Sequence, residues 1–267
     1  MRRFWQDLYG VLSSLQRPMI ISKSKKDLEK MRASGRLVAQ VREALRKLAT
    51  PGITTLELDQ AAEKMIRDGG ALPTFKGYHG YPYAICASIN EQVVHAFPSK
   101  RVLVGGDIIS LDLGVTLEGW VGDTATTVAI GSVSVEALQL IKVTEECLER
   151  AIAQCRPGKR LGDIGWAVQS HAEAHGYGVV REYVGHGIGR KLHEDPQVRN
   201  YGKAGTKDLL RNGYVFAIEP MINMGQHHTK VLADKWTVVT VDGRPSAHCE
   251  HTVAITETGP EILTIME

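Results

Sequence analysis

The sequence of 267 residues has few cysteines, no long apolar run and almost no net charge, and each of these absences excludes a class of protein. Its four cysteines include no CxxC pair and are too few for a disulfide framework, so we expect a reducing, cytoplasmic setting. No stretch reaches the roughly 20 apolar residues that cross a bilayer, so no membrane role is expected. The 32 Lys and Arg nearly balance the 30 Asp and Glu, which argues against a specific nucleic-acid partner.

Residues 1–23 are expected to form a short N-terminal extension. Phe4, Leu8 and Leu15 lie at helical spacing there, which favours a short helix docked on the body of the protein over a targeting peptide. The extension has no zinc-finger cysteine set and no PxxP motif, so it does not indicate a ribosome-docking module. The length and the 43% hydrophobic content allow a sizeable core in one or two domains, and residues 24–267 are expected to form a single domain.

An internal repeat organises the chain. Residues 49–52 recur as 155–158, each ending in Pro-Gly, and 106–112 recur as 213–219 within one residue of the same register. Both copies read as helix, helix and then β-branched strands, with Ser134 as the expected N-cap of the third helix. We therefore predict an α+β fold in which two halves, 25–130 and 134–256, are related by a pseudo-twofold axis around a central antiparallel sheet.

Carboxylates occupy positions where buried strands should carry apolar residues. Asp112 and Asp123 lie in two β-branched runs separated by Glu118-Gly119, a turn signal that would place Asp112 opposite Ala125 in a hairpin.

The repeat aligns Asp112 with Glu219 and Asp123 with Glu250 in the second half. Burying four carboxylates together is prohibitive unless cations neutralise them, and two divalent ions would do so. The alternative is that each acid is an ordinary turn or cap residue at the end of a strand.

Three histidines are candidates for the same site. His186 lies in the segment GHGIG, whose glycines allow the backbone to close around an inward-facing imidazole, and it is the expected nitrogen ligand. His95 and His193 follow apolar or glycine-rich segments and fit catalytic, surface or core positions equally well. No role is expected for the pair His227-His228 or for His248.

These residues and their surroundings resemble the type I methionine aminopeptidases. The likeness runs from about residue 24 to the C-terminus and is specific in order, spacing and flanking residues. It implies the pita-bread fold and removal of the initiator methionine from nascent chains when the second residue is small. The five residues that match the family's metal ligands, in the segments SLDLG, GDTATT, GHGIG, AIEPM and CEHTV, are Asp112, Asp123, His186, Glu219 and Glu250.

The resemblance also implies how the metal ligands divide their work. Asp112 would bind one metal, His186 and Glu219 the other, and Asp123 and Glu250 would bridge the two. The metals could be Co, Mn, Fe, Ni or Zn, because such a ligand set accepts all of these divalent ions.

Substrate residues follow from the same likeness. His95 would contact the amide nitrogen of the scissile bond, His193 the carbonyl oxygen, and Glu219 would transfer protons. Asn90 matches a residue near an accessory monovalent cation. The residues that match the methionine side-chain pocket are Tyr78, Tyr81, Cys86 and Trp236.

The expected partners are the N-termini of nascent polypeptides, with at most a transient association with the ribosome, and we expect a monomer. Two other functions are open. A proline-directed peptidase of the same fold uses the same ligands, although such relatives usually carry a large additional N-terminal domain that about 23 residues cannot supply. A non-catalytic binding module would be expected to lose metal ligands, whereas all five are present.

Overall fold

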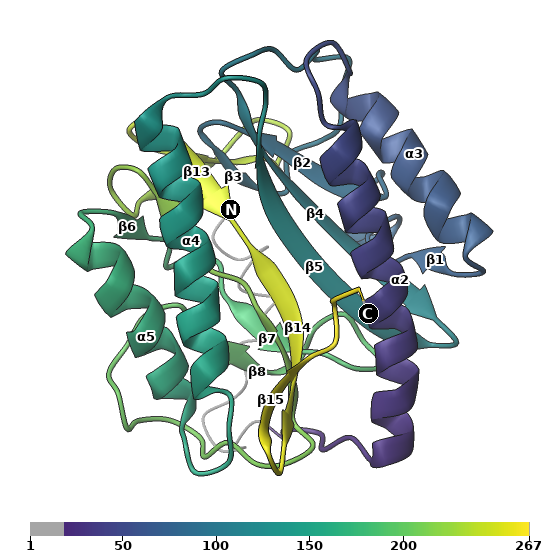
Figure 1. Cartoon of the computed structure of the whole chain (residues 1–267), viewed down its shortest axis with the longest axis vertical. Helices are drawn as coiled ribbons and strands as arrows, with labels where there is room; N and C mark the ends of the chain where they lie inside the picture. The colour runs from purple at the N-terminus through teal and green to yellow at the C-terminus, as the bar shows by residue number, and fades with distance from the viewer. Residues whose placement is uncertain (1–18, 267) are drawn as a thin grey trace.

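The computed structural model describes residues 19–266, so the helix expected around Phe4 to Leu15 lies outside the described residues. Four long helices are arranged as two consecutive pairs, each pair followed by strands (Figure 1). The first pair precedes the strands that carry Asp112 and Asp123, and the second pair precedes those around Glu219 and Glu250. The helices are α2 (Lys25–Leu48), α3 (Thr55–Asp68), α4 (Val135–Gln154) and α5 (Leu161–Ala174).

Capping side chains explain where the helices begin. Ser24 and Thr54 each accept a hydrogen bond from the backbone N–H three residues later, and Asp27 and Glu57 complete the two capping boxes. Ser134 accepts from the N–H of Ala137 at 3.1 Å, which confirms the predicted N-cap of α4.

The principal sheet has nine strands within the described residues, and all of its pairings are antiparallel. Its main path is β1-β4-β5-β14-β9-β7-β8, with β2 beside β4 and β15 beside β14. These strands are β1 (Leu72–Pro73), β2 (Ile85–Ile89), β4 (Ile108–Leu117), β5 (Trp120–Ala129), β7 (Gly185–Gly187), β8 (Glu194–Val198), β9 (Val215–Ile218), β14 (Glu250–Thr256) and β15 (Gly259–Ile262).

Two small sheets and one 3-10 turn complete the fold. One sheet has the order β13-β10-β6 and the other β11-β12-β3, both antiparallel. The elements are η1 (Tyr78–Gly80), β3 (Gln92–Val94), β6 (Gly178–Val179), β10 (Met221–Asn223), β11 (Thr229–Val231), β12 (Val238–Thr240) and β13 (Ser246–His248).

Equivalent backbone hydrogen bonds show the pseudo-twofold repeat directly. The N–H of Gly106 donates to the carbonyl of Ile130 at 3.0 Å, and its counterpart Gly213 donates to Ile255 at 2.8 Å. Both glycines have positive φ, a conformation that strains other residues. The predicted relation between the halves is thus confirmed. Three further pairs of backbone N–H to carbonyl bonds correspond between the halves. Gly52 donates to Leu103 as Gly158 does to Leu210, Leu103 donates to Ile53 as Leu210 does to Lys159, and Thr55 donates to Arg101 as Leu161 does to Asp208.

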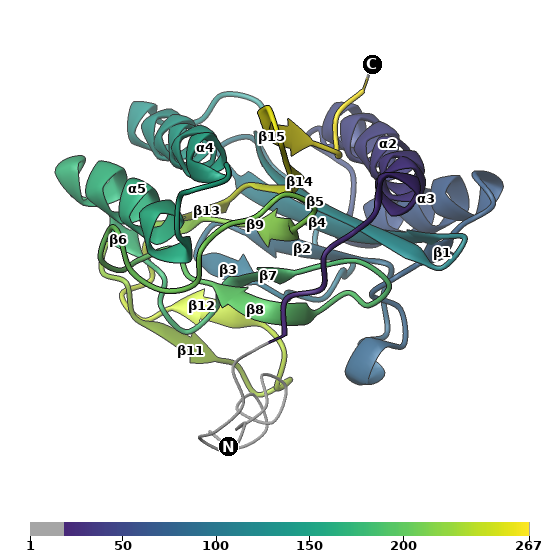
Figure 2. The same ribbon diagram turned by 90° about the horizontal axis from the view of Figure 1, so that it is seen from below.

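All four helices cover one face of the principal sheet and leave the other face for the site (Figure 2). Under α2 and α3 lies a core that includes Leu45, Leu58 and Ile109, all fully buried. A second core under α4 and α5 includes Val143 and Phe216. Burial of these side chains is the main force that holds the helices on the sheet.

The hairpin β4-β5 turns where the sequence predicted. Leu117 pairs with Trp120, so Glu118 and Gly119 are the two central residues, and both have positive φ as tight hairpin turns require. Asp112 therefore pairs with Ala125, as predicted from the turn.

Lys23, at the end of the expected extension, packs into the body of the protein. Its ammonium forms a buried ion pair with Glu194 at 2.6 Å, and its backbone N–H donates to the carbonyl of Gly213. No helix within residues 19–266 combines the length and apolar character needed to cross a bilayer.

Candidate metal centre

One row of paired residues crosses four strands and carries two of the predicted acids. Cys86 on β2 pairs with Asp112 on β4, Asp112 pairs with Ala125 on β5, and Ala125 pairs with Glu250 on β14. Directly paired residues project from the same face of a sheet, so Asp112 and Glu250 flank the small side chain of Ala125. Asp123 precedes Ala125 by two residues and projects from that face as well.

The second half of the chain brings Glu219 and His186 to the same place. Glu219 directly follows β9, whose Ala217 pairs with His186 on β7. The Nε2 atom of His186 lies 3.5 Å from a carboxylate oxygen of Glu219 and 3.9 Å from one of Asp123. Donor atoms of Asp123, His186 and Glu250 all lie within 4.8 Å of one another, and all three residues are buried.

Glycines next to His186 allow its strand to approach its neighbours closely. A Cβ at Gly185 would collide with the carbonyl oxygen of Ala217, and one at Gly187 with that of Asp195. The Nδ1–H of His186 donates to the carbonyl of Gly187 at 2.9 Å. This bond leaves Nε2 unprotonated and turned toward the acids, the orientation that metal-binding histidines commonly have.

Burial and mutual repulsion dominate the electrostatics of the cluster. Burial raises the pKa of Asp112 to about 7. Burial and the neighbouring carboxylates hold the pKa of Asp123, Glu219 and Glu250 well above the ordinary range. Burial also lowers the pKa of His186 to about 4, so the imidazole is neutral and able to act as a ligand.

The donor set fits divalent metal ions. Within the described part of the chain, Oδ1 of Asp112, Oδ1 of Asp123 and Oε1 of Glu250 are buried and accept no hydrogen bond. Orphaned anionic oxygens are costly to bury, and a cation would satisfy all three. Four carboxylates with one imidazole suit hard or borderline divalent ions such as Mn, Fe, Co, Ni and Zn.

His193 and His95 lie on the wall of the same cavity. The ring of His193 packs against that of His186, with centroids 4.3 Å apart, and its Nδ1 is 2.7 Å from the hydroxyl of Tyr78. His95 has a left-handed backbone and packs against the ring of Tyr183. Burial lowers the pKa of His95 to about 4 and that of His193 well below its ordinary value, so both rings are neutral.

Another part of the cavity wall is largely apolar and aromatic. The rings of Tyr81 and Trp236 meet edge to face with centroids 5.1 Å apart, and Tyr81 donates its O–H to the carbonyl of Ile85. Cys86 lies beside them at the end of the row that contains Asp112. The cavity has a volume of about 740 Å³, and all eleven predicted metal, catalytic and pocket residues line it.

Sequence reasoning missed six further lining residues. Phe75, Val94, Leu192 and Met221 are apolar positions without a distinctive motif, so nothing in the sequence separates them from core. His79 and Tyr183 are also in the wall. His79 was detectable, because the repeat aligns it with His186.

Two other sequence assignments concern the surroundings of the cavity. His248 was given no role, yet its Nε2 lies 3.9 Å from Glu219 in a buried position. Asn90 does not line the cavity. Its amide donates to Asp107 at 2.8 Å and its side-chain oxygen accepts from the N–H of Ile108.

A buried cavity that joins carboxylates and an imidazole to an apolar wall defines the site of a metal-dependent hydrolase. Comparisons with known proteins agree. Residues 29–257 match the model of metallopeptidase family M24. Methionine aminopeptidase 1 of Bacillus subtilis is 52% identical over 246 residues, which cover 92% of this chain and 99% of that relative.

Solved structures place the fold in the same group. The methionine aminopeptidase from Rickettsia prowazekii has a TM-score of 0.91 at 43% identity, covering 92% of this chain and all of that one. A prolidase from Pyrococcus furiosus has a TM-score of 0.75 at 22% identity, covering 100% of this chain and 68% of that one, and shares the fold. The chain therefore belongs to metallopeptidase family M24 and, within it, to the methionine aminopeptidases.

Proposed function

We propose that this metallopeptidase removes the initiator methionine from polypeptide N-termini when the second residue is small, using two divalent ions held by Asp112, Asp123, His186, Glu219 and Glu250. The observation that carries the proposal is the convergence of four acids, three of them buried and Glu219 nearly so, and one neutral imidazole on a single cavity with an aromatic wall. Membership of the methionine aminopeptidases supplies the substrate class. When bound, such ions neutralise the acids and make water a nucleophile near neutral pH.

The protein's ligands divide between the two ions in this proposal. Asp112 would hold one ion, and His186 with Glu219 would hold the other. Asp123 and Glu250 would contribute to both. The position of Asp123 supports this role, because its carboxylate is near His186 and also raises the pKa of Glu250.

The side chains around the acids bind the scissile bond. Tyr78 donates its O–H to Nδ1 of His193, which keeps the proton on Nε2 so that the ring can donate to the substrate carbonyl oxygen as charge develops there. His95 contacts the amide nitrogen. Glu219, whose pKa is raised, is able to hold a proton and to deliver it to the departing amine.

The aromatic wall selects the methionine side chain. Tyr81, Trp236 and Cys86 offer a polarisable surface to an unbranched thioether, and Tyr78 closes the side next to His193. Phe97 stands behind them, with its ring 5.4 Å from that of Tyr81, and holds this aromatic group in place.

Further features of the proposal concern the whole protein. Residues 24–267 act as one catalytic domain made of the halves 25–130 and 134–256, and the protein is a monomer that meets nascent chains, with at most a transient association with the ribosome. The four cysteines are buried and unpaired, which supports a reducing cytoplasm. A monovalent cation near Asn90 stays a prediction.

Hydrolysis of two peptides tests the proposal. The metal-loaded protein should release methionine from Met-Ala-Ser and leave an Xaa-Pro peptide intact, and chelation should stop the reaction. Elemental analysis of the active protein identifies the metal and should give at least two ions per chain. Preferred cleavage of the Xaa-Pro peptide would show that the protein is a proline-directed peptidase instead. Absence of any cleavage by a metal-loaded sample would refute the proposal.

A further inference from the structure

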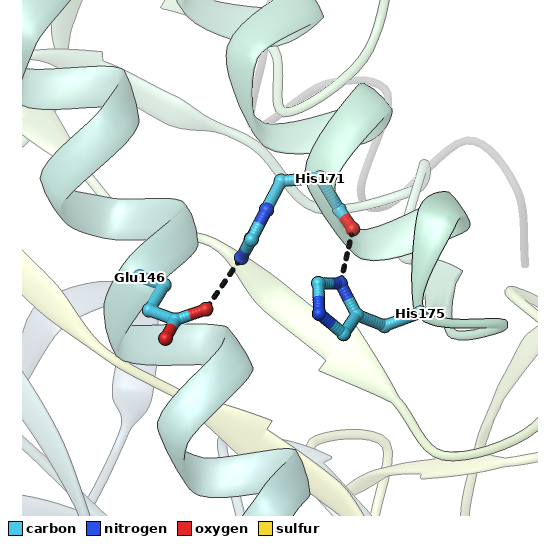
Figure 3. A group of neighbouring side chains, drawn as sticks. All are labelled: Glu146, His171 and His175. Atoms are coloured by element: carbon cyan, nitrogen blue, oxygen red, sulfur yellow. Dashed lines mark hydrogen bonds and ion pairs between the residues drawn. The ribbon is translucent and has the colours of Figure 1, made fainter.

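A second group of potential metal ligands lies on the helical layer, away from the cavity. It consists of Glu146 on α4, His171 near the end of α5, and His175 directly after that helix (Figure 3). One donor atom from each of these residues lies within 4.8 Å of the others. None of the three lines the cavity that contains the acids.

Hydrogen bonds already orient two of these side chains. The Nε2–H of His171 donates to a carboxylate oxygen of Glu146 at 2.6 Å. The Nδ1–H of His175 donates to the carbonyl of His171 at 2.9 Å, which leaves its Nε2 turned toward the same carboxylate (Figure 3). A backbone carbonyl that holds Nδ1 and presents Nε2 is the usual support of a metal-binding histidine.

Helix geometry explains why the two rings meet. His171 and His175 are four residues apart and therefore lie on one face of α5, with ring centroids 4.5 Å apart. The site is also at the C-terminal end of the helix, where the unpaired carbonyls give a partial negative charge that attracts cations. A simple His–Glu ion pair between the helices would not require His175 to face the same point.

The surroundings favour this group over the other exposed one. Glu182, His227 and His228 also lie within metal-binding distance of one another, but Arg181 is close enough to lower the pKa of His227. The positive charge of that guanidinium, which lies 5.5 Å from the ring centroid of Tyr201, repels a metal ion. Beside Glu146, the ammonium of Lys142 is 3.9 Å away on a flexible, exposed stem and can move aside.

We propose that Glu146, His171 and His175 form a second metal site, which binds a divalent ion of the Zn²⁺ class and ties the end of α5 to α4. Two imidazole nitrogens and one carboxylate oxygen are typical zinc ligands, and water completes the coordination. Binding at Nε2 of His171 uses the lone pair of that nitrogen, so the proton that His171 donates to Glu146 moves to Nδ1 of the same ring as the ion takes its place. The side chain of His171 is 11% exposed, so the ion is partly shielded from solvent.

Equilibrium dialysis against Zn²⁺ with elemental analysis tests the site. The wild-type protein should bind one more ion than Glu146→Gln or His175→Ala, whose affinity for that ion should fall about tenfold or more. Glu146→Gln is the gentler variant, because its amide oxygen still accepts from His171. Hydrolysis of Met-Ala-Ser should be unchanged in both variants, since neither residue is near the cavity.

Two controls locate the ion. Glu173→Gln makes the same chemical change on α5 at a residue whose carboxylate accepts a hydrogen bond from the side-chain amide of Gln169, and it should keep the additional ion. Zn²⁺ should also protect His171 and His175 from diethyl pyrocarbonate in the wild type and not in Glu146→Gln. Equal zinc content in the wild type and both site variants would overturn the proposal, as would loss of the ion on His228→Ala instead.

Discussion

His79 and His186 occupy equivalent positions in the two halves but have different surroundings. His186 is buried in β7 between glycines that allow its strand to approach β8 and β9 closely. His79 is exposed at the cavity wall, in η1, with a positive φ. The aligned sequence therefore does not determine whether a histidine becomes a ligand; the local backbone decides which way the ring points.

The residues next to these two histidines also differ between the halves in size and in what they contact. Tyr78 and Tyr81 in the first half form part of the cavity wall, whereas the aligned Gly185 leaves room for neighbouring strands and the aligned Ile188 is buried in the core. The first half thus supplies most of the aromatic pocket and the second supplies the imidazole. The acids, by contrast, come equally from both halves.

The largest effect should come from acids at equivalent positions. Asp123→Asn and Glu250→Gln should each reduce kcat/KM by about a thousandfold or more, because each removes several kcal/mol of charge stabilisation at the metals. The measurement is steady-state hydrolysis of Met-Ala-Ser at matched metal content. If the halves contribute equally, the two losses will be similar, and unchanged turnover at equal metal occupancy would disprove the bridging roles.

The aligned histidines should respond very differently. His186→Ala should weaken metal binding by about a hundredfold, since it removes a ligand, while His79→Ala should change it less than about threefold. Metal titration followed by calorimetry gives both values. Similar losses for the two variants would mean that His79 is also a ligand and that the comparison is wrong.

A smaller effect is expected at His95. His95→Ala should lower kcat about a hundredfold, as removal of one polar contact to the reacting group commonly does, and should leave the metal content unchanged. Single-turnover hydrolysis measures the change in the catalytic rate, and elemental analysis measures the metal content separately. A fall in bound metal would place His95 among the ligands instead.

The smallest expected effect is the pH dependence of the free energy of unfolding, to which the acids of both halves contribute together. Burial raises the pKa of Asp112 to about 7, and burial with mutual repulsion holds the pKa values of the other three acids well above their ordinary range, so the folded metal-free protein holds protons that the unfolded chain has lost. The free energy of unfolding should therefore fall as pH rises from 7 to 8, by about 1 kcal/mol for each proton that the protein releases when it unfolds.

The histidines with lowered pKa values, such as His95 at about 4 and His248 at about 3, act in the opposite sense, but only below about pH 6.5 and therefore outside this range. Denaturant unfolding of the chelated protein at both pH values gives the slope. Saturating metal should abolish it, because the ligands are then deprotonated throughout. An equal free energy at pH 7 and 8 without metal would show that the acids ionise independently.

Much of the fold and the site was predictable because it depends on local patterns. The repeat, the N-cap at Ser134 and the turn at Glu118 and Gly119 follow from short segments, and the register Asp112 to Ala125 follows from that turn. The apolar wall residues were not predictable. Leu192 and Met221 differ from ordinary core residues only in facing a cavity, and no short-range signal records that.

The sequence by itself determined which acids are equivalent, where the hairpin turns and which family the motifs resemble, because these depend on residue type and spacing along the chain. Only the tertiary structure decided that His186 faces the acids while His79 faces the solvent, and that Glu146 meets His171 and His175. Those relations join strands or helices that are distant in sequence, so they exist only when burial of the two cores has set the packing.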